Sequence, residues 1–417
     1  MARHITFIHT ADIHLGKTYR GSSAESERYQ DFFSMLSSIV ADALTHTVDC
    51  VLIAGDLFHT GQILPKTFAK TIEALQPLKD AGIPCIAVEG NHDWIHRRDS
   101  ISWMEALSRM GYLRLLRPAR EPDGSYRFDP FYEQEGTGGC ICVNGYTVYG
   151  LGYIGTLAGS HVERICSAVS TQHNLLLFHV GIWSYSPVEI GCMHPDEAAP
   201  LQDRFQYVAL GHGHKPYTLS GAHEIPYAFN PGAPECVNFG EERYDKGYYL
   251  VEMSDHQVDY QVIPTTPRPM LVIPIDLTGC RTAEQAATQL RTLLEQKRGN
   301  DAYAVSPLIE LKLVGTVEFH PFELGKEQVR SILDQVYAPL HSEIKNQLNL
   351  SVTAGDHDTS QQSLSEIEQD VLRGLISSNG GYEQYADSLV DLALSIRDQV
   401  IHHDGDAEEI IALLKDY

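Results

Sequence analysis

The amino-acid sequence predicts an α/β fold for most of the chain. Short apolar runs recur along the first two thirds of the sequence, polar glycine-rich turns follow these runs, and stretches with helical spacing separate them. With 417 residues, of which 43% are hydrophobic and 21% charged, the chain is long enough for two or three domains. The composition therefore indicates a folded multidomain protein and argues against a small scaffold or a disordered chain.

The apolar runs are four to six residues long, which is typical of strands buried on both faces of a sheet. The expected strands are His4–His9, Cys50–Ala54, Cys85–Val88, Leu175–Phe178 and Tyr207–Leu210. Helical spacing predicts helices between them over residues 26–44 and 66–79. The Asn144-Gly145 pair lies between β-forming residues and predicts a hairpin.

A proline-rich segment divides the sequence. Three prolines fall within residues 264–269, which indicates a stiff connector, so we expect a first domain over residues 1–269. Residues 270–350 alternate strand and helix in a βαβα order that predicts a small two-layer α+β domain. A polar stretch at 351–363 is expected as a linker, and amphipathic spacing predicts a helical tail over 364–417.

The chain is strongly acidic. It has 31 Lys and Arg against 55 Asp and Glu, for a formal net charge of −24. This balance argues against binding to nucleic acid through general electrostatics, because polyanion binding normally requires a basic surface. Any contact with DNA is therefore expected to be local or assisted by metal ions.

Cysteine usage and the lack of targeting segments predict a soluble, cytoplasmic protein without a membrane partner. The eight cysteines have no C-x-x-C pair and no regular spacing, so reduced thiols are expected. The N-terminal residues lack the features of a secretory signal, and no apolar run reaches the length of a membrane span.

Potential metal ligands follow all five predicted strands. They are Asp12 and His14; Asp56 and His59; Asn91, His92 and Asp93; His179; and His212 and His214. The carboxyl ends of strands in an open α/β sheet meet at one edge, so we expect these clusters to lie together there. Carboxylate, imidazole and amide ligands favour divalent ions such as Mn²⁺, Fe²⁺ or Zn²⁺. Seven ligands drawn from this set are too many for one ion and predict two ions, bridged by a shared carboxylate and suited to phosphoryl displacement.

A single D-x-H or G-H-x-H pattern is weak evidence, because an ordinary surface or core histidine is more common than a ligand. We infer a metal site because five clusters occur in order, each at the end of an apolar run. The histidines without this setting are expected to be ordinary residues, and they include His4, His46, His161, His173, His223, His402 and His403.

The order of these motifs resembles the calcineurin-like metallophosphoesterase superfamily over residues 1 to about 260. More narrowly, HTADIHLGKTYRG, GDLFHTG, GNHD, LGHGHKPY and NPGAPECVNFGE resemble the SbcD/Mre11 group of DNA repair nucleases. The resemblance implies a sandwich of two mixed β-sheets flanked by helices. It also implies that residues 270–350 form a capping domain, followed by a helical tail.

The resemblance implies roles for individual residues. The ligands of one ion would be Asp12, His14, Asp56 and His214. Those of the second would be Asp56, Asn91, His179 and His212, so that Asp56 bridges the two ions. His92 would act as a general acid or stabilise the transition state, and His59 would help to set the phosphate. Asp93 is expected to orient His92 or a ligand, or else to cap the following turn.

Two functions from different classes stay open. The first is a Mn²⁺-dependent DNA nuclease, a hydrolase that acts in DNA repair with an SbcC/Rad50-like ATPase. The second is a small-molecule phosphodiesterase or protein phosphatase built on the same catalytic domain. Net charge favours the second, whereas the additional domains and the narrower motifs favour the first. A scaffold without activity is disfavoured because no expected ligand is missing from the sequence.

Further features concern partners. Five basic residues close to the ligands in sequence are expected to contact the DNA backbone without reading its bases: Lys17, Arg20, Arg97, Arg98 and Lys215. In the related nucleases, helices equivalent to residues 66–79 and 100–110 form a homodimer, and core packing within the monomer is the alternative. The tail either packs on this protein's own domains or grips the coiled-coil base of the ATPase.

Overall fold

The computed structural model describes residues 3–19, 24–94, 100–169, 173–186, 190–221, 224–299, 303–351 and 385–402, and five single positions between 368 and 376. The chain forms two compact units. The first comprises Met1–Ile273, Asp301–Glu310 and Tyr337–Glu343, and the second comprises Pro274–Asn300, Leu311–Val336 and Ile344–Tyr417. The linker expected at 351–363, apart from Ser351, and most of the tail expected over 364–417 lie outside the described residues.

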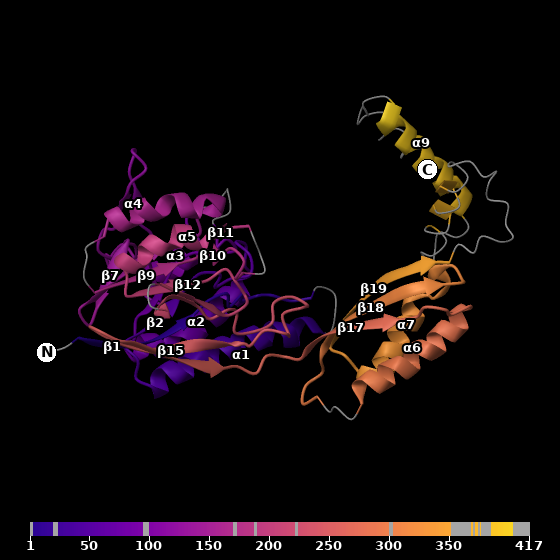
Figure 1. Ribbon diagram of the computed structural model, residues 1–417, viewed down its shortest axis with the longest axis horizontal. Helices are drawn as coiled ribbons and strands as arrows, with labels where there is room; N and C mark the ends of the chain where they lie inside the picture. The colour runs from indigo at the N-terminus through magenta and orange to yellow at the C-terminus, as the bar shows by residue number, and fades with distance from the viewer. Residues whose placement is uncertain are drawn as a thin grey trace. The chain divides into compact units, whose positions relative to one another are not determined.

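The first unit contains two six-stranded sheets (Figure 1). The first sheet has the order β16-β15-β1-β2-β3-β4. Its strands are β1 (His4–Thr10), β2 (Cys50–Ile53), β3 (Cys85–Ala87), β4 (Arg114–Leu115), β15 (Gly247–Ser254) and β16 (Val258–Pro264). Strands β1 to β4 are parallel, whereas β15 pairs antiparallel with β1 and with β16, so the sheet is mixed.

The second sheet has the order β13-β14-β12-β9-β8-β7. Its strands are β7 (Cys140–Val143), β8 (Tyr146–Leu151), β9 (Asn174–Phe178), β12 (Tyr207–Leu210), β13 (Tyr217–Ser220) and β14 (Pro226–Asn230). Parallel pairs join β8, β9, β12 and β14, and antiparallel hairpins close both ends. The predicted hairpin is confirmed, because Asn144 and Gly145 connect β7 to β8 with φ of 48° and 83°, as a two-residue turn requires.

Helices cover the outer faces of the sandwich. They are α1 (Ala24–Thr45), α2 (Pro65–Asp80) and α3 (Trp103–Arg109) on the first sheet, and α4 (Val162–Ser167) and α5 (Pro195–Ala198) on the second. Alternate residues of the strands pack on opposite faces: Leu175 and Leu177 lie between the two sheets, whereas Leu176 and Phe178 face the outer helices. The predicted sandwich of two mixed sheets flanked by helices is therefore confirmed.

Several short elements complete this unit. They are β5 (Ala119–Arg120) paired with β6 (Tyr126–Arg127), β10 (Gly181–Ile182) paired with β11 (Cys192–Met193), and the 3-10 helices η1 (Gly155–His161) and η2 (Ala199–Asp203). On α3, Met104 and Leu107 are fully buried in the core under the first sheet. These two side chains therefore pack within the monomer.

The described chain after β16 contains a three-stranded sheet with the order β17-β18-β19. The elements are β17 (Met270–Asp276), α6 (Ala283–Arg298), β18 (Leu308–Val317), η4 (Pro321–Glu323), α7 (Lys326–Tyr337) and β19 (His341–Leu350), and in the tail α9 (Ala386–His402). The expected order of strand, helix, strand and helix is found, and β19 adds a strand that the sequence pattern did not predict. No helix within the described residues is long and apolar enough to cross a membrane.

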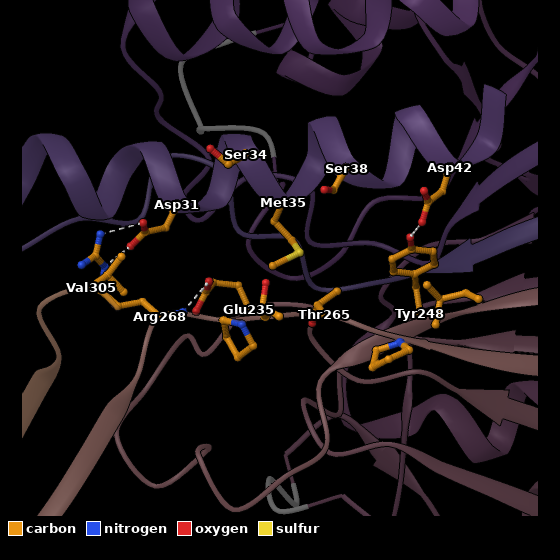
Figure 2. A pocket seen from close by; sticks show the side chains of 14 residues that line it. Asp31, Ser34, Met35, Ser38, Asp42, Glu235, Tyr248, Thr265, Arg268 and Val305 are labelled. Carbon is orange, nitrogen blue, oxygen red and sulfur yellow. Dashed lines mark hydrogen bonds and ion pairs between the residues drawn. The ribbon is translucent and has the colours of Figure 1, made fainter. Parts of the chain in front are cut away.

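The proline-rich segment after β16 is anchored to α1 beside a cavity of about 310 Å³ (Figure 2). Arg268 donates two hydrogen bonds to the Asp31 carboxylate, at 2.6 and 3.0 Å, and its backbone N–H donates to Glu235 at 3.3 Å. Glu235 also pairs with the fully buried Arg28 at 3.1 Å. Because the two arginines pair with these two carboxylates, the proline-rich segment is held against α1 within the first unit.

Candidate metal centre

The candidate ligands lie in loops that leave the carboxyl ends of five parallel strands. Those after β1, β2 and β3 come from the first sheet, and those after β9 and β12 come from the second. The prediction of a single sheet edge is therefore corrected: two sheets contribute. All seven predicted ligands converge where the two sheets meet at that end of the strands, because these strands run in parallel within each sheet.

Asp12, His14 and His214 form the first group. Their potential ligand atoms all lie within 4.8 Å of one another. The Nε2 atoms of His14 and His214 are 3.1 Å apart. The Asp56 Oδ2 atom lies 3.8 Å from Nε2 of His14, so Asp56 adjoins this group.

Asn91, His179 and His212 form the second group. The Asn91 Oδ1 atom lies 3.1 Å from Nε2 of His179 and 3.0 Å from Nδ1 of His212. The same Oδ2 atom of Asp56 that faces His14 lies 3.6 Å from Nε2 of His179. Asp56 therefore sits between the two groups, as a bridging carboxylate would.

The backbone at this centre adopts conformations that side-chain-bearing residues rarely take. Left-handed φ values of 53°, 53°, 52° and 77° occur at Asp12, His14, Asp56 and His212. Each such residue costs about 1–3 kcal/mol and is typical of functional sites. An added Cβ at Gly90 would lie 2.0 Å from Oδ1 of Asp56, so only glycine fits beside that carboxylate.

Hydrogen bonds orient the imidazole rings of three candidate ligands. Nδ1 of His179 donates to the Ala54 carbonyl and Nε2 of His212 to the Ile190 carbonyl, each at 2.6 Å. Nδ1 of His214 donates to Glu241 at 2.8 Å. The other nitrogen of each ring then carries a lone pair toward the centre, which is the arrangement found in metal-ligating histidines.

The electrostatics of the centre suit a cation. Burial lowers the pKa of His14 well below its usual range and that of His212 to about 4, so both rings are neutral and able to ligate. Burial raises the pKa of Asp12 to about 6, although His214 and His179 oppose the shift. Among the described residues, Oδ2 of Asp12 is buried without a hydrogen-bond partner. A bound divalent ion would satisfy this carboxylate oxygen.

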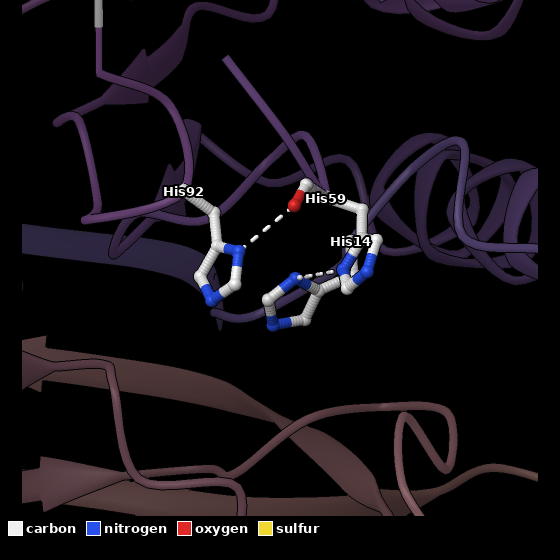
Figure 3. A group of neighbouring side chains, drawn as sticks. All are labelled: His14, His59 and His92. Carbon is white, nitrogen blue, oxygen red and sulfur yellow. Dashed lines mark hydrogen bonds between the residues drawn. The ribbon is translucent and has the colours of Figure 1, made fainter. Parts of the chain in front are cut away.

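The two predicted catalytic histidines lie beside His14 of the first group (Figure 3). His92 donates its backbone N–H to Oδ1 of Asp56 at 2.9 Å and its Nδ1 proton to the His59 carbonyl at 2.8 Å. The rings of His59 and His92 stack with centroids 5.4 Å apart, and the His92 ring lies 4.8 Å from that of His14. These bonds hold the His92 ring with Nε2 as the atom available for proton transfer.

Asp93 ties the loops after β2 and β3 together. Its Oδ1 accepts from the backbone N–H of Phe58 at 2.8 Å, and its Oδ2 accepts from those of Leu57 at 3.2 Å and Gly90 at 2.9 Å. All three donors precede Asp93 in the sequence, so these bonds join the two loops and do not cap the turn that follows Asp93.

Sequence reasoning missed Glu241 and Lys246. Glu241 lies in the quoted NFGE motif, which was given no chemical role. Its carboxylate accepts from His214 and from Lys246, both at 2.8 Å. Although burial acts in the opposite direction, these two partners lower the pKa of Glu241 to about 2. No pattern in the sequence links Glu241 to His214, which lies 27 residues earlier.

Two of the five predicted DNA-contacting residues are described. Lys17 is half-buried and Lys215 is exposed. Burial, together with the nearby charge of Arg28, lowers the pKa of Lys17. Arg20, Arg97 and Arg98 lie outside the described residues.

Three relatives found by comparison with known proteins share the same name. The chain is 27% identical over 278 residues to the DNA double-strand break repair protein Mre11 of Saccharolobus solfataricus, covering 65% of this chain and 66% of the relative. The protein of the same name from Haloferax volcanii is 29% identical, and the aligned segment covers 68% of this chain and 57% of the relative. The protein of the same name from Sulfolobus acidocaldarius is 26% identical, and the aligned segment covers 88% of this chain and 90% of the relative. The chain thus spans less than two thirds of the first two relatives.

Among solved structures, the protein TT1561 of Thermus thermophilus aligns with 63% of this chain and 99% of its own at 14% identity, with a TM-score of 0.35. The family model of the calcineurin-like phosphoesterases matches residues 5–216, which is more than half of the 417 residues. The matched segment contains all seven candidate ligands together with His59 and His92. The chain therefore belongs to the calcineurin-like phosphoesterase family.

Proposed function

We propose that the protein is a dinuclear metal-dependent nuclease that hydrolyses phosphodiester bonds of DNA in repair. The main support for this proposal is the position of Asp56. Its Oδ2 atom lies 3.8 Å from Nε2 of His14 in one ligand group and 3.6 Å from Nε2 of His179 in the other. A carboxylate placed in this way would be shared by two ions, which would supply the electrostatic stabilisation that a phosphoryl displacement needs. Relatives that carry the name of a DNA double-strand break repair protein support DNA as the substrate.

The proposal assigns two ion sites. Asp12, His14 and His214 hold one ion, Asn91, His179 and His212 hold the other, and Asp56 is shared. A donor set of oxygen and imidazole nitrogen without thiolate suits Mn²⁺. When bound, the ions polarise the scissile phosphate and stabilise the charge that develops on it.

His92 is the proposed proton donor to the leaving oxygen. Its Nδ1 is committed to the His59 carbonyl, so Nε2 is the atom that transfers the proton. His59 stacks on His92 and contacts Nδ1 of His14 at 3.4 Å. Burial lowers the pKa of His59 to about 4, so this ring is neutral at pH 7 before a substrate binds.

DNA contact is proposed to be local and independent of sequence. The net charge of −24 opposes a broad electrostatic footprint, so Lys17, Lys215 and the ions carry the attraction to the phosphate backbone. A homodimer through the α2 and α3 region would use exposed side chains such as Leu64 and Met110, which are 68% and 47% exposed. The proposed ATPase partner would be bound by the C-terminal tail.

A comparison of substrates tests this function. The purified protein is incubated with Mn²⁺ and linear duplex, single-stranded or hairpin DNA, alongside bis(p-nitrophenyl) phosphate, with the Asp56→Asn protein as control. We expect Mn²⁺-dependent cleavage of at least one DNA form at a higher kcat/KM than that of the simple ester. Turnover of the ester alone, with every DNA form left intact in the presence and absence of an ATPase partner, would instead identify a small-molecule phosphodiesterase.

A further inference from the structure

We propose that Glu241 positions His214 and thereby makes the ion site of the first ligand group the tighter of the two, so that the ions load in sequence. This inference rests on the ion assignment in the proposed function. Glu241 itself lies outside both ligand groups.

The carboxylate of Glu241 is held by five donors. Its Oε1 accepts from His214 Nδ1 at 2.8 Å, from Asn238 N at 3.0 Å and from Asn238 Nδ2 at 3.1 Å. Its Oε2 accepts from Val237 N at 3.0 Å and Lys246 Nζ at 2.8 Å. Glu241 and Lys246 are each only 6% exposed. A carboxylate fixed from both oxygens cannot turn away from the imidazole that it contacts.

This contact determines how His214 faces the centre. With its Nδ1 proton donated to Glu241, Nε2 carries the lone pair, and Nε2 lies 3.1 Å from Nε2 of His14. A carboxylate acceptor increases the electron density of an imidazole more than a neutral carbonyl does. His214 is therefore a stronger ligand than a histidine bonded to the backbone, and its ring is held in place before an ion binds.

Within the part of the chain that the structure describes, no carboxylate accepts a hydrogen bond from the second ligand group's histidines in this way. The rings of His179 and His212 donate to the backbone carbonyls of Ala54 and Ile190. Asn91 is the third ligand, so the shared Asp56 is the one charged group that the proposed ligand set gives the second ion. The first ion has Asp12 as a ligand in addition to Asp56, with Glu241 one hydrogen bond away, although an oxygen of Asp12 also lies within 4.8 Å of ligand atoms of Asp56 and His179.

The additional ligand carboxylate and the fixed His214 ring both favour tighter ion binding at the first site. Because a divalent cation is held more tightly where more negative charge surrounds it, the first site binds more strongly. Lys246 offsets part of the charge of Glu241, so the carboxylate contributes mainly by fixing His214, while Asp12 supplies the direct charge. The second site is then the exchangeable one, and its occupancy governs activity at low Mn²⁺ concentration.

Metal binding without substrate tests this inference. The full-length, metal-free protein is titrated with Mn²⁺ by calorimetry and by electron paramagnetic resonance, which separates isolated from coupled ions. We expect two binding steps in the wild type. In Glu241→Gln, the tighter step is expected to weaken about 10- to 100-fold while the weaker step stays unchanged. The matched control is Glu242→Gln, which removes the same charge from the exposed neighbour and is expected to change neither step.

A second variant keeps the inference testable if Glu241→Gln does not fold, as judged by its circular dichroism spectrum. Asn91→Asp adds a charge to the second group and is expected to tighten the weaker step by at least about tenfold. Two equal steps in the wild type, an unchanged tighter step in folded Glu241→Gln, or no effect of Asn91→Asp would overturn the inference but leave the nuclease proposal standing. Failure of the wild type to bind any Mn²⁺ would refute both.

Discussion

The backbone N–H of His92 donates to Oδ1 of Asp56 over 2.9 Å, while Oδ2 of the same carboxylate faces both ligand groups. Asp56 therefore orients the proposed proton donor and bridges the proposed ions at the same time. The link to Asp56 is made by the His92 main chain and not by its ring, so the two functions can be separated by mutation.

Replacing His92 by alanine is expected to slow catalysis and to leave both ions bound. The backbone bond to Asp56 persists in His92→Ala, whereas the Nε2 proton donor is lost, which costs a factor of about 10² to 10⁴ in kcat. Steady-state kinetics beside metal analysis by mass spectrometry measure the two effects. A His92→Ala protein that loses metal as readily as His212→Ala would show that His92 is a ligand and not a catalyst.

Replacing Asp56 by asparagine is expected to lower metal content at both sites and to abolish activity. Asparagine tolerates the φ of 52° at this position, so the change removes the bridging charge without adding backbone strain. Metal analysis of Asp56→Asn should show a loss of both ions, and thermal unfolding of the metal-free protein should be close to that of the wild type. Loss of a single ion would contradict the bridging role.

The sequence predicted the strands of this fold because they are buried on both faces. The runs Cys50–Ala54 and Tyr207–Leu210 match β2 and β12 within one residue, since a continuous apolar run leaves little freedom in locating such a strand. Strand β19 was missed because its residues HSEIKNQLNL are largely polar and only one of its ten side chains is buried. Its three apolar residues, Ile344, Leu348 and Leu350, fall on alternate positions, but Asn346 interrupts the pattern, and pairing with β18 decides the structure.

The candidate site was predictable as a set of residue types, but not in its supporting contacts. Ligands at strand ends follow from local sequence, which is why Asp12, His179 and His212 could be named in advance. That they come from two sheets, and that Glu241 supports His214, depends on contacts between distant segments. Local patterns carry no information about such pairs.

The tight packing around Asp56 predicts the effect of a single methyl group. A Cβ at residue 90 would lie 2.0 Å from Oδ1 of Asp56 and 2.5 Å from its backbone nitrogen, so Gly90→Ala must displace that residue. We expect Gly90→Ala to lose metal binding and activity. Gly325→Ala is the matched control, because an added Cβ there meets no atom within 4 Å. Equal metal content in Gly90→Ala and the wild type would show that the centre tolerates such a shift.

A buried neutral histidine between the two sheets predicts a loss of stability in acid. His9, on β1, is fully buried, and its ring nitrogens bond to Tyr207 Oη at 2.9 Å and to the Leu210 carbonyl at 3.0 Å on β12. Burial lowers the pKa of His9 to about 3, although the bond to Leu210 opposes the shift. Between pH 6.5 and 3 the unfolded chain therefore binds a proton that the folded chain does not, and folding weakens as the pH falls.

Urea unfolding of the metal-free protein at pH 7 and pH 5 measures this effect. One such proton lowers the free energy of unfolding by up to about 2 kcal/mol between about pH 6.5 and 5. His9→Gln can keep a donor and an acceptor in the same place and does not titrate, so its free energy of unfolding should fall by correspondingly less over this interval. Buried carboxylates and imidazoles of the metal centre titrate in both proteins, and their contribution cancels in the comparison. An identical pH dependence in the two proteins would mean that His9 is protonated in the folded state, against the geometry in which Nδ1 accepts from Tyr207 while Nε2 donates to Leu210.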